Sequence, residues 1–221
     1  SPDSKSVGFF VTGKLKKIDI AGGPPLTICD ARVGRSGTWN RNGVIVFAPD
    51  NQSTSLLRVS AAGGEPTPVT KLETGQTNHR FPWFLPDGKH FLFVAMPARQ
   101  GSYDVYAGAL DSKERKHILT ASSAPVYAQP GYLIFVRNSS LVAQRFDMRA
   151  LAVSGDPISL GEAPPPSGFT ASNTVTASDN GITARLGGGL PNTELKWLDR
   201  TGHPAGTIPV PEGRYEGVKL S

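Results

Sequence analysis

Short apolar runs alternate with polar turns along the whole chain, and each run is too short for a buried helix. The segment 81–96 is a clear case, because two apolar runs flank a Pro-Asp-Gly-Lys turn at 86–89. Glycine allows a positive φ, proline fixes φ, and aspartate can bond the following backbone amides. The pattern therefore predicts a tight β-hairpin centred on Gly88.

This turn recurs at a regular interval. Equivalent turn positions, called anchors here, are Ser4, Gly43, Gly88, Gly131 and Gly181, at steps of 39, 45, 43 and 50 residues. A second marker, glycine with proline two places on, occurs at Gly23, Gly64, Gly155 and Gly202, at steps of 41, 91 and 47 residues, of which 91 spans two periods. Two independent markers at one period indicate a repeat protein.

Each period holds four short β-patterned runs and shows no helical periodicity. Four strands per repeat are typical of a β-propeller blade, whereas a β-sandwich, the alternative, does not require this four-strand period. We predict an all-β propeller of four-stranded antiparallel blades, five in number, in a single domain 1–221. The predicted blades are 214–221 with 1–32, 33–76, 77–121, 122–163 and 164–213.

The two ends of the chain complement each other. Residues 215–221 match the first strand of a repeat without its turn, and residues 1–12 match a turn and second strand without the first. We expect the C-terminal strand to pair with strand 7–12 and close the ring, which removes two sheet edges. The alternative is a stretch cut from a longer propeller, which would leave an open ring able to self-associate.

Composition excludes several classes of protein. The 221 residues are 38% hydrophobic with 25 Gly and 19 Pro, which suits many tight turns, and no apolar run is long enough for a transmembrane helix. The single cysteine, Cys29, excludes an internal disulfide. The net charge of +5 is spread over the repeats, with no basic cluster interleaved with aromatics, so nucleic-acid binding is not expected.

The repeats resemble a known group of propellers. The segments "LPDGKHFLFV", "RVSAAGGEPTPVT" and "YAGALDSKERKHIL" resemble WD-repeat-like propeller repeats of the TolB type. More narrowly, "GTWNRNGVIVFAP", "HRFPWFLPDGKHFLFVA" and "PGYLIFVR" resemble the C-terminal propeller region of bacterial eukaryotic-like serine/threonine kinases. The sequence departs from that pattern at Ser4, at Cys29 and in "LGGGLPNTE", and kinase motifs are absent from it. The resemblance implies a sensor domain on the extracytoplasmic face of a membrane-anchored parent protein.

A search for catalytic motifs finds none. The histidines His79, His90, His117 and His203 lie in different repeats without metal-ligand spacing, so we expect surface or loop histidines. Cys29 is expected to be a buried strand residue, and we predict no metal site and no cofactor. Five-bladed glycosidases need a pair of carboxylates near the axis. A single carboxylate, Glu216, occurs in the predicted inner strands, which are 33–39, 77–85, 122–128, 170–178 and 214–221. We therefore predict a domain without catalytic activity of its own.

Two registers of the inner strands carry the binding hypothesis. If Ser221 is laid over Ser1, the first anchor, Ser4, counts as position 224. The polar residues eight places before the anchors are then Arg35, Arg80, Ser123, Asn173 and Glu216, and the apolar residues four places before are Trp39, Phe84, Tyr127, Ala177 and Leu220. The polar ring is either a solvated channel entrance or a site for a polar or anionic ligand, with Arg35, Arg80, His79 and Arg214 as donors. We expect Trp39, Phe84 and Tyr127 to be buried between blades.

The sequence thus predicts a binding module for an unknown protein or a small polar or anionic ligand at the axial face. The predicted setting is the sensor or scaffold part of a bacterial receptor-type kinase. The alternatives are a periplasmic TolB-like interaction protein and the substrate-gating propeller of a serine peptidase. We expect no direct membrane contact by this segment itself.

Overall fold

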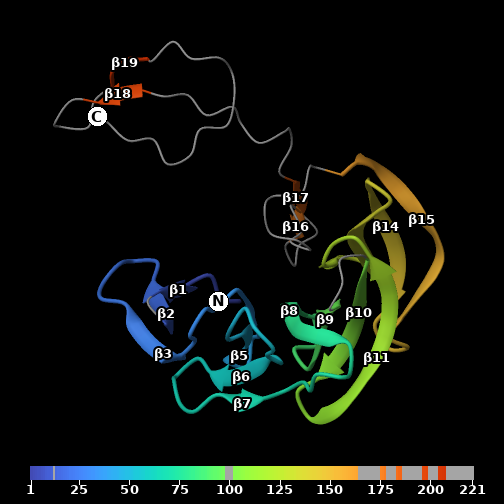
Figure 1. Ribbon diagram of the computed structural model, residues 1–221, viewed down its shortest axis with the longest axis horizontal. Coiled ribbons are helices and arrows are strands. Elements are labelled where there is room, and N and C mark those ends of the chain that lie inside the picture. Colours follow the sequence, from blue (N-terminus) through green and yellow to red (C-terminus); the bar gives the residue numbers. More distant parts are fainter. Residues whose placement is uncertain are drawn as a thin grey trace. The chain divides into compact units, whose positions relative to one another are not determined.

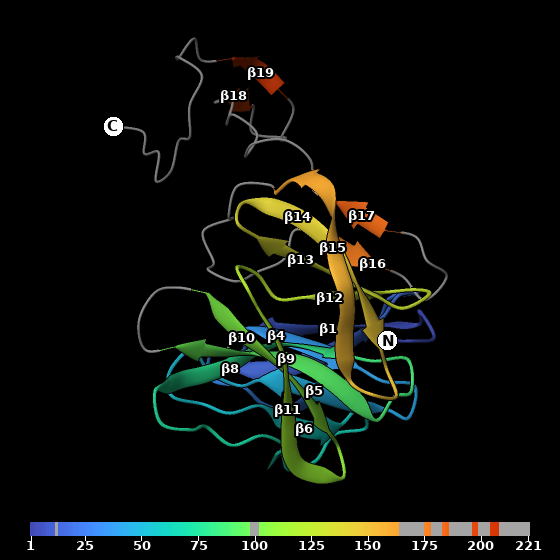
Figure 2. The ribbon, with the colours of Figure 1, turned by 90° about the vertical axis from the view of Figure 1, so that its right-hand side faces the viewer.

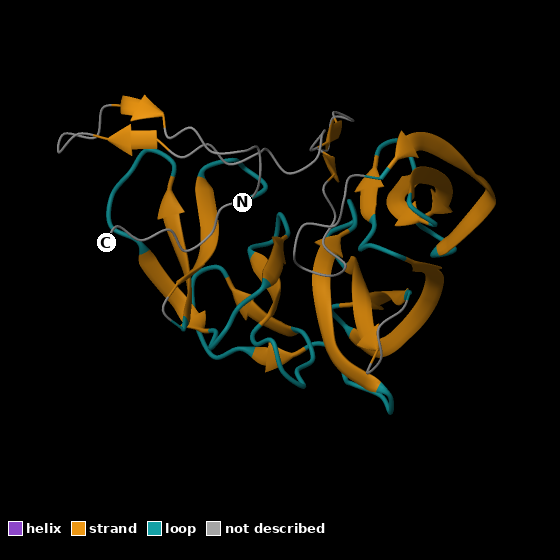
Figure 3. Cartoon of the chain, turned by 45° about the horizontal axis from the view of Figure 1, so that its top comes forward, coloured by secondary structure: helices purple, strands orange, loops and turns teal. Residues whose placement is uncertain are grey.

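The computed structural model describes residues 1–11, 13–97, 102–163 and 175–177, and the backbone of strands 183–185, 196–198 and 204–207. All regular elements in these ranges are β-strands (Figure 3). Within the same ranges, no helix of the length and apolarity needed to cross a membrane is found. The chain divides into two compact units, Ser1–Leu186 and Gly187–Ser221, which are described separately.

The first unit consists of antiparallel sheets that follow one another along the chain (Figure 1). The first sheet contains β1 (Ser6–Val11), β2 (Lys14–Asp19) and β3 (Leu26–Asp30). The second contains β4 (Ser36–Trp39), β5 (Val44–Ala48), β6 (Leu57–Ser60) and β7 (Thr67–Pro68). The third contains β8 (Gln76–Phe84), β9 (His90–Pro97), β10 (Tyr103–Ala109) and β11 (Ser112–Ala121). The fourth contains β12 (Val126–Ala128), β13 (Tyr132–Arg137), β14 (Ser140–Asp147) and β15 (Ala152–Glu162).

Every sheet is a meander in which consecutive strands pair, and the second to fourth sheets have four strands each. The predicted four-stranded antiparallel blade is therefore confirmed. Figure 2 shows the fourth sheet next to the third, in agreement with the contacts that β11 makes with β13 and β15. The pair β16 (Val175–Ala177) and β17 (Thr183–Arg185) ends the first unit. The second unit contains the antiparallel pair β18 (Lys196–Leu198) and β19 (Pro204–Thr207). The predicted closing strand 214–221 lies outside the described residues.

The predicted anchors have the backbone that the turn requires. The φ angles are +57° at Ser4, +73° at Gly43, +69° at Gly88 and +128° at Gly131. The prediction that Ser4 replaces glycine in the first turn is thereby confirmed, because serine there adopts the left-handed conformation that glycine adopts elsewhere. The last anchor, Gly181, lies outside the described residues.

Gly43→Ala is expected to lower the free energy of unfolding by roughly 1 kcal/mol, because φ is positive there although no atom would crowd the new Cβ. Gly8→Ala is the matched control, since Gly8 has no positive φ and the nearest atom to its Cβ would be 3.9 Å away. Urea titrations of the two variants check this. Equal stability of the two proteins would show that the turn conformation carries no energetic cost.

The hydrophobic core lies between neighbouring sheets. One cluster joins the second and third sheets through Val46 on β5 and Phe91 and Phe93 on β9, all fully buried. A larger cluster, which includes the fully buried Leu133 and Phe135, joins the third and fourth sheets. Successive sheets thus bury their apolar faces against each other, as the propeller prediction requires.

Hydrogen bonds also join the second sheet to the third. Four of these bonds lie along β4 and β8: Phe81 N to Ser36 Oγ (2.9 Å), Phe84 N to Thr38 Oγ1 (3.1 Å), Asn40 Nδ2 to Gly88 O (2.7 Å) and Arg41 Nη2 to Pro86 O (3.0 Å). In each of the four a side chain of the second sheet, or of the turn after β4, meets a backbone atom of the third sheet. These bonds hold β4 beside β8.

Strand β8 contains a bulge. Arg80 pairs with Val94 and Trp83 with Leu92, so that one extra residue is inserted between them. Phe81 within the bulge has a φ of +52°, which is strained for a bulky side chain. A bulge changes the direction of the side chains around it, and such bulges are frequent near binding sites. The residue directly before this one is Arg80.

Candidate functional site

The predicted polar ring is partly described. Arg35 is exposed just before β4, and Arg80 is half-buried in β8. Ser123 is buried just before β12. Asn173, Arg214 and Glu216 lie outside the described residues. The second and third sheets therefore place two arginines at neighbouring inner strands, Arg35 just before β4 and Arg80 in β8.

Arg80 is incompletely satisfied. Its Nη2 donates a hydrogen bond to the carbonyl oxygen of Asn51 (3.2 Å), whereas its Nε is buried and has no hydrogen-bond partner among the described residues. Asn78 Nδ2 donates to the same carbonyl (3.3 Å), and the Oδ1 of this side chain is also buried without a partner. Buried polar atoms are normally bonded, so unbonded ones suggest a group that is not present.

Positive charge accumulates around Arg80. Burial lowers the pKa of the Arg80 guanidinium, the positive charge of Arg35 lowers it further, and Tyr103 opposes the shift. Each of these two causes disfavours a bare cation at this position. An anion bound beside Arg80 would offset both effects by favourable charge interaction.

Ser123 has a structural role. Its hydroxyl accepts a hydrogen bond from Val136 N (2.9 Å) and donates to Ala124 O (3.2 Å). The oxygen thereby takes the place of a backbone carbonyl beside β13. The Ser123 hydroxyl is therefore already hydrogen-bonded within the protein.

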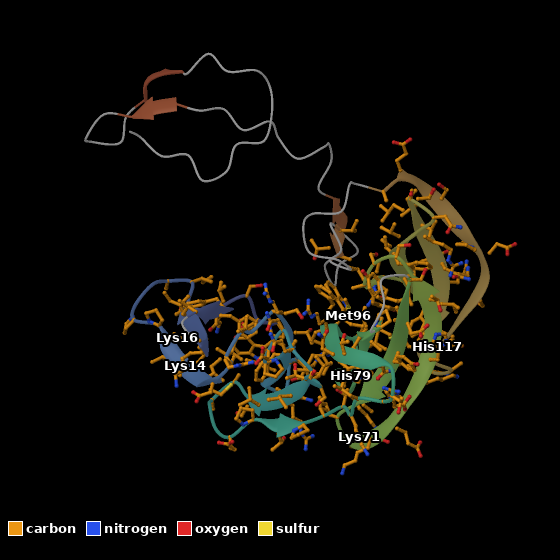
Figure 4. All side chains as sticks on the ribbon, in the orientation of Figure 1. Lys14, Lys16, Lys71, His79, Met96 and His117 are labelled. Carbon is orange, nitrogen blue, oxygen red and sulfur yellow. The ribbon has the colours of Figure 1, made fainter. Side chains whose placement is uncertain are left out.

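The expectation of a surface histidine is wrong for His79, which is fully buried (Figure 4). Nδ1 lies 2.8 Å from Thr70 Oγ1, and Nε2 lies 3.0 Å from Gln76 Oε1. Its ring packs on Phe93 with centroids 4.7 Å apart. Burial, aided by the charge of Arg115, lowers the pKa of His79 to about 4, so that the ring is neutral at pH 7. His79 belongs to the packing between the second and third sheets and is not a ligand donor.

The apolar ring lies toward the other end of the inner strands and lines a cavity of about 610 Å³. Tyr127 is buried, as predicted, but Trp39 and Phe84 are only half-buried because they face this cavity. Ala177 also lines it, and Leu220 lies outside the described residues. The expectation that all three aromatic residues are buried between sheets is therefore wrong for two of them.

Two further expectations concern reactive groups. Cys29 is buried in β3, as predicted, and burial raises the pKa of its thiol to about 11, so it is a poor nucleophile. Within the ranges that the structure describes, no three His, Cys, Asp or Glu side chains gather as a metal site would need.

Comparison with known proteins places the fold. No family model matches the chain. No curated protein matches it either. Among solved structures, the calcium-binding protein regucalcin from Agrobacterium tumefaciens is 15% identical, with a TM-score of 0.60 over 96% of this chain and 72% of that one. A gluconolactonase from Xanthomonas campestris is 14% identical, with a TM-score of 0.59 over 90% of this chain and 69% of that one. The chain has a β-propeller fold.

A chain of a nidogen/laminin complex is similar as well, at 14% identity and a TM-score of 0.59 over 80% of this chain and 65% of that one. The fold prediction is thus confirmed by these propellers, whereas the TolB-type and kinase-linked assignment finds no support in them. The prediction of a non-catalytic domain is contradicted, because the similar propellers include an enzyme. That prediction rested on the absence of motifs for a few chemistries, among them the paired carboxylates of a glycosidase, and a propeller can carry another.

Sequence reasoning missed two groups beside Arg80. Asn78 is two residues before Arg80 in a strand, so its side chain lies on the same face, and strand alternation could have found it. The carbonyl oxygen of Asn51 lies in the loop after β5, and no sequence signal marks a backbone atom.

Proposed function

We propose that the first unit binds a small organic anion between Arg35 and Arg80. The observation that supports this most directly is the buried Nε of Arg80, which has no hydrogen-bond partner among the described residues. A carboxylate accepts two parallel hydrogen bonds from one guanidinium, so it can use Nε and a terminal nitrogen together. The bulge at Phe81 lies directly beside Arg80, and such bulges are frequent near binding sites.

The class of anion that fits best is a sugar acid. Asn78 Oδ1 is a buried acceptor without a partner, and a ligand hydroxyl could donate to it beside the carboxylate. The similar propeller named gluconolactonase is named for a neutral lactone, and hydrolysis of that lactone gives a sugar acid, which supports the choice. D-Gluconate is therefore the probe of first choice.

The proposal fits more than one biological setting. An anion site on a propeller could serve as the ligand-binding site of a sensor domain in a receptor-type kinase, as the sequence resemblance implies. Alternatively, it could bind the substrate of an enzyme. Sequence outside this chain separates the kinase-linked, TolB-like and peptidase-gating alternatives. An assay of D-glucono-lactone hydrolysis, in which the release of acid is measured, distinguishes binding from catalytic turnover.

Arg80→Gln is expected to weaken D-gluconate binding by at least tenfold in a calorimetric titration, because a charge-assisted pair is lost. Arg35→Gln should weaken it as well, and Arg80→Lys should retain part of the affinity. Arg41→Gln is the matched control, since Arg41 lies beside the cavity of the apolar ring. Gluconate affinity that is insensitive to both Arg35→Gln and Arg80→Gln, in variants with unchanged thermal unfolding, would contradict the proposal.

A further inference from the structure

The cavity of the apolar ring has features that a hydrophobic core lacks. Core interiors are packed without voids larger than a water molecule. This cavity has about 610 Å³, within the range of about 300–1,000 Å³ that is typical of small-molecule sites. Space of this size between the strands that line it is thus large enough for a ligand.

Five aromatic side chains form part of its wall. They come from β1, β4, β8 and β12, and the five are Phe10, Trp39, Trp83, Phe84 and Tyr127. Both tryptophans are half-buried, so part of each indole faces the cavity and not another side chain. Partly exposed indoles of this kind offer flat apolar faces to a ligand, and their N–H groups add hydrogen-bond donors.

Polar groups are interleaved with these rings. Thr38, Arg41 and Gln129 line the same cavity. Arg41 Nη2 donates to the carbonyl oxygen of Pro86 (3.0 Å), which fixes its guanidinium beside the cavity. Asn40, in contrast, is fully used by the turn, because it donates to Gly88 O and accepts from the backbone N–H groups of Asn42 and Val44. The wall therefore combines apolar faces with a few donors and acceptors.

We infer that this cavity is a carbohydrate-binding site that takes a neutral pyranose ring. A pyranose presents an apolar C–H face, which stacks on an indole, and a rim of hydroxyls, which needs donors and acceptors beside it. A purely aliphatic ligand would leave the polar groups unpaired, and that desolvation is unfavourable.

The site is distinct from the anion site. Arg80 and Phe84 lie on the same strand, on opposite sides of the bulge, and Arg80 does not line the cavity. The two sites can therefore be removed independently. Loss of sugar binding at the aromatic wall would leave the affinity for D-gluconate at Arg80 intact.

The test uses the three indole N–H signals of Trp39, Trp83 and Trp197 in a ¹H–¹⁵N spectrum, assigned through the variants Trp39→Phe, Trp83→Phe and Trp197→Phe. The probes are D-glucose, D-galactose, D-mannose and N-acetylglucosamine, each titrated to its solubility limit. We expect at least one sugar to shift the Trp39 and Trp83 signals with a saturating curve. Trp39→Phe should weaken that sugar at least threefold, whereas Arg80→Gln should not change it.

Two results would overturn the inference. One is the absence of any saturating shift at Trp39 and Trp83 with all four sugars. The other is sugar binding that shifts only the Trp197 signal, or that survives Trp39→Phe and Trp83→Phe together. The variants retain an aromatic ring at each position, so the protein should remain folded, and the unchanged gluconate titration verifies this.

Discussion

Phe93→Ala is expected to lower the free energy of unfolding by about 3–5 kcal/mol. Phe93 is fully buried between the second and third sheets. Its ring stacks on Tyr106 with centroids 5.7 Å apart and packs on Phe91 at 6.0 Å and on His79 at 4.7 Å. Truncation removes these contacts and leaves a cavity that close-packed strands cannot collapse to fill.

Phe84→Ala is the matched control. Phe84 is the same residue type on the neighbouring strand β8, but it is half-buried and faces the cavity of the apolar ring. Its truncation should cost less than half as much, because water can occupy the space that it leaves. Denaturant titrations measure both values, with one slope of unfolding free energy against denaturant concentration fitted to both variants. Equal losses in the two variants would show that the burial assigned to Phe93 is wrong.

Acidification from pH 6.5 to pH 4 is expected to destabilise the protein by about 3 kcal/mol through His79 alone. The folded pKa is about 4, below the ordinary value of 6.5. As the pH falls through this window the unfolded chain binds a proton that the folded chain excludes, so the free energy of unfolding decreases. The geometry agrees: if Nε2–H donates to Gln76 and Nδ1 accepts from Thr70, the ring is satisfied in its neutral form.

His79→Gln should flatten this pH dependence between pH 6.5 and pH 5, where carboxylates contribute little because their ordinary pKa lies lower. His117→Gln is the control. His117 sits on β11 at the outer side (Figure 4), with about half of its side chain exposed beside Asp104. Stability measured by denaturant titration at several pH values gives the two slopes. If the pH dependence persists in His79→Gln and disappears in His117→Gln, the acid sensitivity comes from His117 and the prediction is wrong.

The fold could be predicted because the turn chemistry is local. The anchors at Ser4, Gly43, Gly88 and Gly131 need a left-handed residue, and the sequence marks that need at a regular spacing. Strand order follows at once, since short turns join neighbouring strands. Blade closure depends on residues 214–221, which lie outside the described part, and it stays a prediction.

The candidate site was only partly predictable. His79 and Arg80 are adjacent in a strand, so their side chains point to opposite faces, and both could not line one site. Register selected Arg80, and His79 was included only because it is its neighbour in the sequence. The bulge at Phe81 could not be foreseen either, because its support, the bond from Phe81 N to Ser36 Oγ, comes from another sheet. The half-buried state of Trp39 depends in the same way on the space between sheets.

The bonds between the second and third sheets bear on how such a protein can evolve. In these four bonds, side chains of the second sheet and its turn meet N–H and C=O groups of the third. An unmodified carbonyl exists at every residue and an N–H at every residue except proline, whatever the side chain. A duplicated repeat could thus dock on its neighbour without a matching partner sequence, and later drift in the acceptor strand would leave the seam intact. The weak likeness among the repeats of this chain, despite their common period, is what that history would leave behind.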